Sequence, residues 1–330
     1  MNSTLVRAAL LAAVTAAPLY PEETAAPAKP SVQLVQVEDG VKLEVADWGG
    51  TGRTLILLGG LGATYHEFDG FGPKLAAKYH VLGITRRGFG GSSVPATGYT
   101  ADRLGDDVVA VIDALKLNRP VLVGHSMAGE ELSSVGSRHP EKIAGLVYVE
   151  AAYAYAFYDP AVGDLTLDSI ALKQELAGLL PGNGRPDQQH LTEELLQTMA
   201  QVERELKERR EQMKGMEDPP RPQPGTKSVV PVPIQGIFVG EQKFTEIHAP
   251  VLAIFALPHD LKDFYKDDPA GLAKAEADDA VRVGAQADAF QKGVPSAHVA
   301  RIAHASHFIF GSNEADVLRE MDAFLGSLPP

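Results

Sequence analysis

The chain has 330 residues, no cysteine and a formal net charge of −13, with 45% hydrophobic residues. The negative charge and the absence of a basic cluster argue against a nucleic-acid-binding protein, and the absence of cysteine excludes disulfides, thiolate nucleophiles and cysteine-ligated metals. The length and apolar content suit an α/β protein that folds around one large core and carries an insertion.

Residues 1–30 are predicted to form a signal-like segment and a flexible linker. Arg7 precedes a short apolar run at residues 8–16 that ends in small residues and resembles a secretory signal, with cleavage after Ala16. The run is too short to span a bilayer, and no other segment is a plausible transmembrane helix. We therefore expect export to the periplasm or the medium, and a tail on a cytoplasmic protein is the alternative.

Strands and helices are expected to alternate along most of the remaining chain. Residues 32–37 and 41–48 indicate a β-hairpin that turns at Asp39-Gly40. Further strands are predicted at residues 54–58, 80–84, 120–123, 144–149, 251–256 and 297–302, and helices at 101–115, 130–138 and about 314–325. This alternation predicts an α/β fold in which helices cover a mostly parallel sheet.

The alternation is interrupted between residues 156 and 246. Apolar residues recur at helical spacing from Leu191 to Leu206, with charged residues on the opposite face, and a proline-rich stretch follows at 219–224. The predicted organisation is a core made of residues 31–155 and 247–330, with a helical insertion at 156–246.

The most informative motif is G-H-S-M-A-G at residues 124–129. It lies between an apolar run and a helix-forming stretch, which is the strand–turn–helix setting of a nucleophile elbow. Small residues such as Gly124 and Ala128 suit a cramped turn that would present the Ser126 hydroxyl to a substrate and a base. Ser126 is the candidate nucleophile, and an ordinary buried serine in a turn is the alternative.

Three other motifs follow predicted strands: G-G-L-G at 59–62, R-R-G-F-G-G-S-S at 86–93 and A-S-H-F at 305–308. Together with the elbow, and in this order, they resemble the α/β-hydrolase superfamily over about residues 34–155 and 247–328. The resemblance implies the α/β-hydrolase fold with a cap formed by residues 156–246, and the chemistry of a serine esterase.

A serine hydroxyl needs a base within hydrogen-bonding reach, and the pKa of imidazole suits that role. Of the ten histidines, His304 and His307 follow the last predicted strand. The family motif places the base there, before an aromatic residue, so His307 is the expected base and His304 its structural neighbour. His125 is expected to support the elbow.

The resemblance also implies an oxyanion hole made by the backbone amides of Leu61 and Met127. Gly59 and Gly60, which would let the backbone approach a ligand closely, stand where the family usually has His-Gly. One such preorganised donor is worth on the order of 3 kcal/mol, because negative charge develops on the carbonyl oxygen during the reaction. The Arg86-Arg87 pair is expected to be structural, and an acidic substrate is the alternative.

Two carboxylates compete for the role of triad acid. Asp260 follows the predicted strand 251–256, at the usual family position, but its spacing departs from the common pattern by about one residue. Glu150 directly ends the strand 144–149, a position that some relatives use. Both preserve the chain order serine, acid, histidine. Glu150 is slightly favoured because its placement at a strand end is clear, and Asp260 is the alternative.

The expected function is cleavage of small to medium carboxylic esters through an acyl-enzyme, without a cofactor. A serine in the elbow argues against aspartate-dependent dehalogenases and epoxide hydrolases. The sequence has no helical His-x-x-x-His pair with a nearby third ligand, so no catalytic metal is expected. A lactonase, an amidase or a cofactor-free perhydrolase is the alternative, and a catalytically silent binding protein is another. A small-molecule ester is the only partner expected; the oligomeric state is open.

The aromatic run after the strand 144–149 bears on the substrate pocket. Tyr153, Tyr155, Phe157 and Tyr158 are expected either to line an apolar pocket for an acyl or aryl group or to anchor the cap.

Overall fold

The computed structural model describes residues 29–180, 187–214 and 230–329. The predicted signal-like segment, its cleavage point and the proline-rich stretch at 219–224 lie outside the described residues. Within the described ranges, no helix combines the length and the apolar character needed to cross a membrane.

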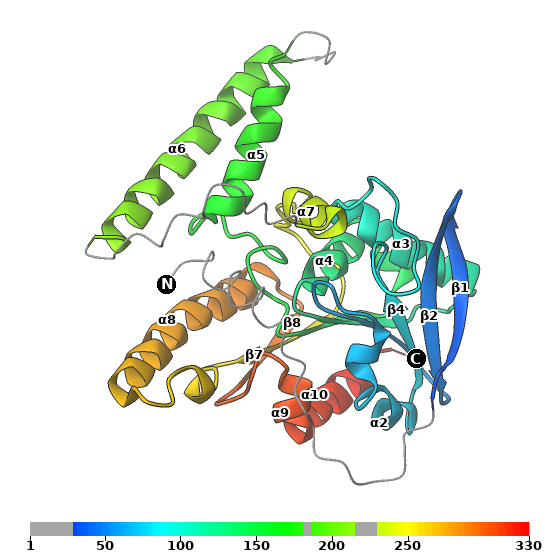
Figure 1. The fold of residues 1–330 in the computed structure, drawn as a ribbon. Coiled ribbons are helices and arrows are strands. Elements are labelled where there is room, and N and C mark those ends of the chain that lie inside the picture. Colours follow the sequence, from blue (N-terminus) through cyan, green and yellow to red (C-terminus); the bar gives the residue numbers. More distant parts are fainter. Residues whose placement is uncertain (1–28, 181–186, 215–229, 330) are drawn as a thin grey trace.

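An eight-stranded sheet forms the centre of the molecule (Figure 1). The strand order is β1-β2-β4-β3-β5-β6-β7-β8; the β1–β2 and β2–β4 pairs are antiparallel and all others parallel. The strands are β1 (Ser31–Glu38), β2 (Val41–Gly49), β3 (Thr54–Leu58), β4 (His80–Thr85), β5 (Val121–His125), β6 (Gly145–Val149), β7 (Val251–Ala256) and β8 (Ala297–Ile302). The prediction of a mostly parallel sheet is confirmed.

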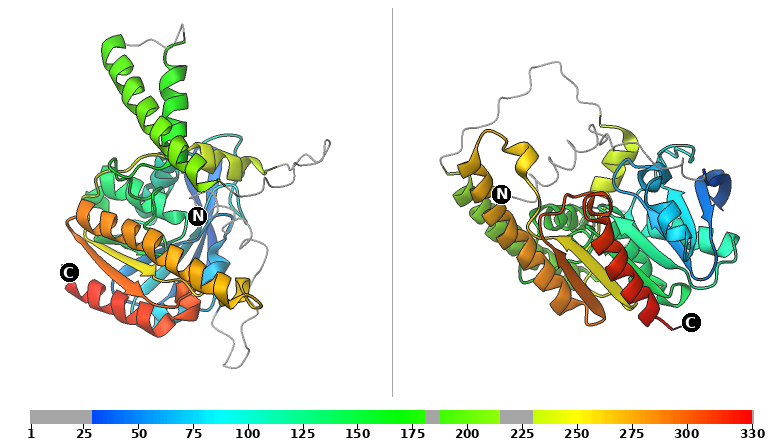
Figure 2. Two further views of the ribbon diagram at one scale, coloured as in Figure 1. Left: turned by 90° about the vertical axis from the view of Figure 1, so that its left-hand side faces the viewer. Right: turned by 90° about the horizontal axis from the view of Figure 1, so that it is seen from below.

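Helices cover both faces of this sheet, as two views of the ribbon show (Figure 2). One apolar core includes Leu104 of α3, Leu132 of α4 and Phe290 of α8, and the other includes Leu75 of α2 and Met321 of α10. The helices are α2 (Gly72–Ala76), α3 (Ala101–Ala114), α4 (Ala128–Arg138), α5 (Leu165–Ala177), α6 (Gln188–Gln212), α7 (Val232–Val239), α8 (Pro269–Gly293), α9 (Ile309–Ser312) and α10 (Glu314–Ser327), with short 3-10 turns at Tyr65–Phe68, Pro140–Lys142 and Lys262–Phe264. Because both faces are covered, β5, β6 and β7 are buried along their whole length and carry almost only apolar residues.

The parallel register brings the carboxyl ends of the central strands to one edge of the sheet. His125 at the end of β5 pairs with Val149 at the end of β6, and Val149 pairs with Ile254 of β7. The residues that directly follow these strands therefore meet at this edge, where ligands bind in open α/β sheets.

Helices α5 and α6 form a hairpin that stands out from the sheet and its covering helices (Figures 1 and 2). The predicted amphipathic stretch lies within α6: Leu191 and Leu195 are buried, whereas Met199 and Leu206 are 52% and 51% exposed. The assignment of residues 156–246 as a cap stays a prediction.

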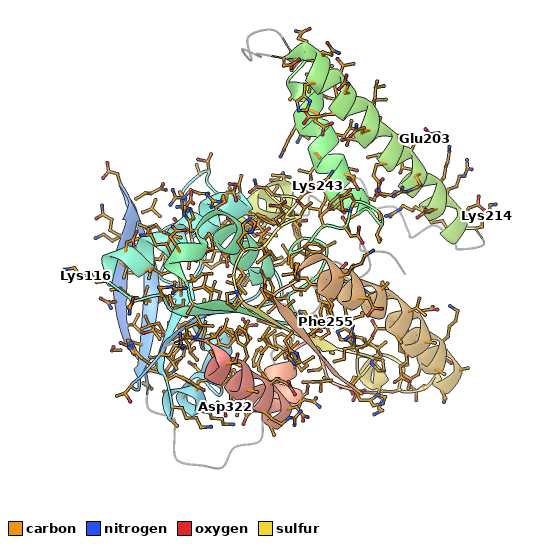
Figure 3. The ribbon with its side chains drawn as sticks, turned by 180° about the vertical axis from the view of Figure 1, so that it is seen from behind. Lys116, Glu203, Lys214, Lys243, Phe255 and Asp322 are labelled. Carbon is orange, nitrogen blue, oxygen red and sulfur yellow. The ribbon has the colours of Figure 1, made fainter. Side chains whose placement is uncertain are left out.

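The hairpin is fastened to the rest of the protein at the start of α5. The Asp168 carboxylate is fully buried; it accepts a hydrogen bond from the Tyr158 hydroxyl at 2.7 Å and pairs with Lys243 Nζ at 2.6 Å. Figure 3 shows Lys243 where the hairpin meets the core. Phe157 packs edge-on against Phe290 of α8. Phe157 therefore anchors the insertion to α8, whereas Tyr158 holds the start of α5 in place within the insertion.

Candidate active site

Ser126 occupies the sharp turn between β5 and α4, with a backbone φ of 53°. This left-handed conformation is uncommon outside glycine and is typical of functional turns. The turn also requires small neighbours: a Cβ on Gly124 would come within 2.6 Å of Leu132, and one on Gly129 within 2.0 Å of the Ala151 carbonyl oxygen. Ala128, the first residue of α4, is fully buried. The strand–turn–helix context predicted for the elbow is therefore present.

His307 lies between Ser126 and Glu150. Its Nε2 is 3.0 Å from Ser126 Oγ, and its Nδ1 is 3.2 Å from Glu150 Oε2. His304 takes no part in this arrangement; it is exposed, and its backbone amide donates to the Pro258 carbonyl at 2.9 Å. The structure thus brings together the predicted serine, histidine and first-choice carboxylate, from positions up to 181 residues apart in the chain.

The two candidate acids occupy different surroundings. Glu150 is fully buried, and its Oε1 accepts a hydrogen bond from the Ala256 amide at 2.6 Å. The Asp260 side chain is 36% exposed; it accepts a hydrogen bond from the Lys262 amide at 3.1 Å and pairs with Lys262 Nζ at 3.6 Å. Glu150, and not Asp260, therefore meets the imidazole of His307.

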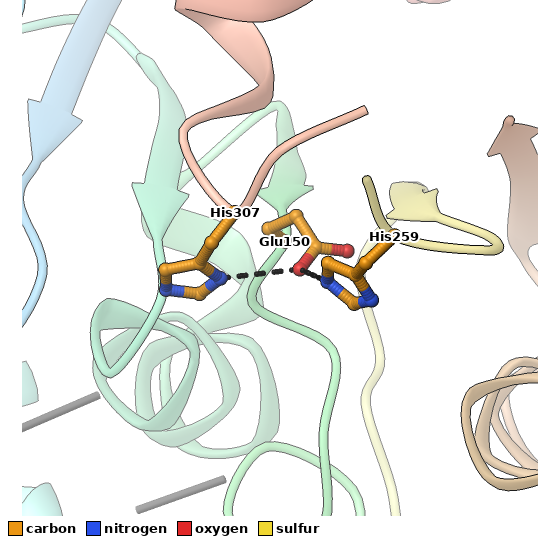
Figure 4. A group of neighbouring side chains, drawn as sticks. All are labelled: Glu150, His259 and His307. Atoms are coloured by element: carbon orange, nitrogen blue, oxygen red, sulfur yellow. Dashed lines mark hydrogen bonds and ion pairs between the residues drawn. The ribbon is translucent and has the colours of Figure 1, made fainter. Parts of the chain in front are cut away.

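A second histidine, to which the sequence interpretation gave no role, also contacts Glu150. His259 Nε2 is 2.8 Å from Glu150 Oε2, so the carboxylate lies between two imidazoles (Figure 4). On its other side, His259 Nδ1 is 2.9 Å from Asp279 Oδ2 in α8. Only the place of His259 in the turn after β7, beside Asp260, could have indicated it from the sequence.

The protonation states of this cluster follow from its contacts. Burial raises the pKa of Glu150, but His259 and His307 outweigh that effect and hold the pKa well below the usual range. Burial lowers the pKa of His259, yet Glu150 and Asp279 outweigh it and raise the pKa to about 10. Burial and the nearby His125 and His259 lower the pKa of His307 despite its bond to Glu150. At neutral pH the site therefore holds a carboxylate, an imidazolium and a neutral imidazole that can accept a proton.

A second buried pair, His125 and Glu67, holds the backbone of His307. His125 Nε2 is 2.9 Å from the His307 carbonyl oxygen, and His125 Nδ1 is 2.7 Å from Glu67 Oε1. The contact with Glu67 raises the pKa of His125 even though burial opposes it. The expected supporting role of His125 matches these contacts. Glu67, which lies 58 residues away in the sequence, was not anticipated.

The G-G-L-G loop passes directly beside Ser126. A Cβ on Gly60 would lie 3.2 Å from Ser126 Cβ, and one on Gly59 would lie 2.5 Å from Glu67 Oε2. The Gly60 amide donates to Glu67 Oε2 at 2.9 Å, so it is not available to a ligand. Within the described part of the chain, neither Leu61 nor Met127 has an acceptor for its backbone amide. These two amides remain the candidate oxyanion donors.

Arg86 and Arg87 make internal ion pairs. Arg86 pairs with Glu131 and donates to the carbonyl oxygens of Gly59 and Gly60, both at 3.0 Å. Arg87 pairs with Asp107. Arg86 therefore holds the glycine loop in place through its two carbonyl oxygens. The contacts of Arg86 and Arg87 agree with the structural role expected for the pair.

Glu150, His259 and His307 place one ligating atom each within 4.8 Å of the others, which is close enough for a shared metal ion. A metal would need both histidine nitrogens that face Glu150 to be free of protons. His259 has a carboxylate oxygen on each side, and because carboxylates only accept hydrogen bonds, its ring donates on both sides. The contacts therefore favour a hydrogen-bonded cluster of Glu150, His259 and His307 over a metal site.

Comparisons with known proteins agree with this architecture. The family model described as alpha/beta hydrolase fold matches residues 53–314. A putative carbamate hydrolase of Caulobacter segnis is 32% identical over 114 residues, which are 34% of this chain and 43% of that protein. A non-heme chloroperoxidase of Streptomyces lividans is 32% identical over 123 residues, which are 36% of this chain and 44% of that protein. The aligned segments thus span less than half of these relatives.

Solved structures extend the likeness over most of the chain. A bromoperoxidase from Bacillus anthracis covers 90% of this chain and 100% of its own, with a TM-score of 0.56 and 17% identity. A carboxylesterase from Bacillus subtilis covers 91% and 93%, with a TM-score of 0.52 and 16% identity. At such identities the likeness shows the fold alone. The family match covers most of the chain and the fold agrees with it, so the protein belongs to the α/β-hydrolase family.

Proposed function

We propose that the protein is a serine hydrolase that cleaves small to medium carboxylic esters through an acyl-enzyme intermediate. One observation carries the proposal: His307 hydrogen-bonds Ser126 Oγ at 3.0 Å through one ring nitrogen and Glu150 at 3.2 Å through the other. A nucleophile, a base and a carboxylate that orients the base are the parts that acyl transfer to water requires. The hydrolases among its relatives support the broader reaction class.

In the first half-reaction, Ser126 Oγ attacks the ester carbonyl while His307 Nε2 takes the hydroxyl proton. Glu150 keeps the Nδ1 proton of His307 in place and stabilises the imidazolium that forms. The oxyanion would accept hydrogen bonds from the amides of Leu61 and Met127. His307 then returns the proton to the alcohol as the ester bond breaks, which leaves Ser126 acylated.

In the second half-reaction, water attacks the acyl-enzyme. His307 takes a proton from this water, and the tetrahedral intermediate uses the same two amides. Collapse of the intermediate releases the carboxylic acid and returns the proton to Ser126. The cycle needs only groups of this chain and water.

We also propose that residues 156–246 form a cap that shapes the substrate pocket. The position of the insertion between β6 and β7 supports this, because the chain enters it shortly after Glu150, at the carboxyl end of β6. The substrate proposed here is a small molecule.

Turnover of p-nitrophenyl acetate and butyrate by the wild type and by Ser126→Ala tests the proposed function. Ser31→Ala is a matched control, because Ser31 is an exposed serine on β1, outside the proposed cap. We expect Ser126→Ala to lose at least about a thousandfold in turnover, as in other serine hydrolases, and Ser31→Ala to equal the wild type. Equal rates for the wild type and Ser126→Ala would refute the proposal.

A further inference from the structure

We propose that His259 is a positioning residue of the triad: it shares the Glu150 carboxylate with His307, holds that carboxylate in place and balances its charge. The inference deepens the function proposed above and depends on it. His259 follows β7, and its ring hydrogen-bonds Glu150 and Asp279 rather than Ser126, so it would act through Glu150.

The first argument is that three hydrogen-bond donors share one carboxylate oxygen of Glu150. Glu150 Oε2 accepts hydrogen bonds from His259 Nε2 at 2.8 Å, from the Tyr153 hydroxyl at 2.8 Å and from His307 Nδ1 at 3.2 Å. The bond to His259 is thus shorter than the bond to the catalytic base. The other oxygen is held by the Ala256 amide. His259 therefore helps to set the position and the electron density of the atom that orients His307.

The second argument is the fixed protonation of His259. Its two ring nitrogens face carboxylate oxygens of Glu150 and Asp279 at 2.8 and 2.9 Å, and its backbone amide donates to Asp279 as well. Because carboxylates accept and do not donate, both ring nitrogens carry protons and the ring is an imidazolium. Arg282 donates to the far oxygen of Asp279 at 2.7 Å. Charges thus alternate along Glu150, His259, Asp279 and Arg282.

The consequence concerns the basicity of His307. The titratable groups that face His307 are Glu150, Ser126 and the ring of His125, whose own partner is Glu67. The titratable groups that face Glu150 are His259, Tyr153 and His307. A fully buried Glu150 with no counter-charge would hold a proton on His307 strongly. Burial is the main cause of the lowered pKa of His307, and the positive charge of His259 adds to it by offsetting the attraction of Glu150. His307 is thereby kept unprotonated, and able to act as a base, at neutral pH.

His259→Gln separates this role from a purely structural brace, because the amide can still donate one hydrogen bond to Glu150 but carries no charge. We expect kcat for p-nitrophenyl butyrate to fall roughly tenfold with KM nearly unchanged, because a displaced Glu150 carboxylate would orient His307 less well. We also expect the acidic limb of the kcat–pH profile to move upward by roughly one pH unit, because one positive charge near His307 is lost. His248→Gln is the matched control, since His248 is an exposed histidine on another loop.

A readout that needs no activity keeps this inference distinct from the proposed function. Titration of the His307 ring by nitrogen-15 NMR in a Ser126→Ala background, with and without His259→Gln, measures the pKa directly. The inference expects a higher pKa of His307 in the His259→Gln variant. Superimposable NMR titrations or acidic limbs, or a loss of kcat that only follows the folded fraction seen by circular dichroism, would overturn it.

Discussion

His307 Nδ1 lies 3.2 Å from Glu150 Oε2, and this contact joins a residue after β8 to a residue that ends β6. Glu150 adopts a φ of 52° and is fully buried, so its carboxylate is directed to the edge of the sheet from a constrained backbone. Asp260, at the position after β7 that the family resemblance suggested for this acid, contacts Lys262 instead. The proposed triad therefore takes its acid from the end of β6, the strand next to β5, which leads into the elbow.

The first prediction compares the two candidate acids. Glu150→Gln should lower turnover by roughly two to four orders of magnitude, because the amide can stabilise the wrong tautomer of His307 and cannot stabilise its charge. Asp260→Asn should stay near the wild-type rate, since that side chain contacts Lys262. Steady-state kinetics with circular dichroism of both variants checks this. A collapse of Asp260→Asn beside an active Glu150→Gln would reverse the assignment.

The second prediction concerns the pH dependence of catalysis. Only the unprotonated form of His307 can accept the serine proton, and the pKa of this residue is lowered from 6.5, chiefly by burial and also by the nearby His125 and His259. Activity should therefore be full at pH 7 and fall only as the pH drops through a value below 6.5. A kcat–pH profile between pH 4 and 9 measures this limb, with His248→Gln as a control. An acidic limb centred above pH 7 would contradict the protonation states assigned to the site.

The third prediction tests the buried pair Glu67 and His125, which contacts the backbone of His307. Glu67 accepts hydrogen bonds from His125 and from the Gly60 amide. Burial raises the pKa of Glu67, but His125, the Gly60 amide and His307 together outweigh that effect and lower it. In Glu67→Gln, one of these two donors would face the N–H group of the glutamine side chain and lose its acceptor. The free energy of unfolding should therefore fall by about 1–3 kcal/mol, and turnover should fall with it. Chemical denaturation and kinetics measure both effects.

Glu141→Gln, which alters an exposed glutamate of the 3-10 turn Pro140–Lys142, is the control for that experiment. It should leave both the unfolding free energy and turnover within error of the wild type. If Glu67→Gln behaved in the same way, the proposed support of the glycine loop and of His307 would be wrong.

The fourth prediction concerns the N-terminal segment. Export followed by cleavage after Ala16 would give a mature protein that begins at Ala17. N-terminal sequencing or intact mass of protein recovered from the native host measures the start. A chain that begins at Met1 in the soluble cytoplasmic fraction would exclude export.

Local sequence patterns predicted much of this architecture because they report short-range constraints. The apolar runs gave the strands, and the small residues around Ser126 marked a cramped turn, since Gly124 and Gly129 have no room for a Cβ. The place of His307 after the last strand made it the first-choice base. The choice between Glu150 and Asp260 was nearly even, because it depends on side-chain directions after two adjacent strands, which no local pattern records.

His259 and Glu67 were missed for a related reason. His259 reaches Glu150 across 109 residues of sequence, and Glu67 reaches His125 across 58. Such buried partners are defined only once the sheet register has brought the strand ends together. Glu67 lies in the 3-10 turn Tyr65–Phe68 and His259 in the turn after β7, and nothing in the residues next to them identifies these distant partners.

Covalent labelling of the nucleophile tests the central claim most directly. A fluorophosphonate reacts with a serine that an adjacent imidazole activates, and intact mass followed by peptide mapping locates the adduct. We predict one adduct per chain, on Ser126, with labelling abolished in Ser126→Ala and strongly slowed in His307→Ala. An unlabelled wild type, or equal labelling of the wild type and Ser126→Ala, would contradict the account.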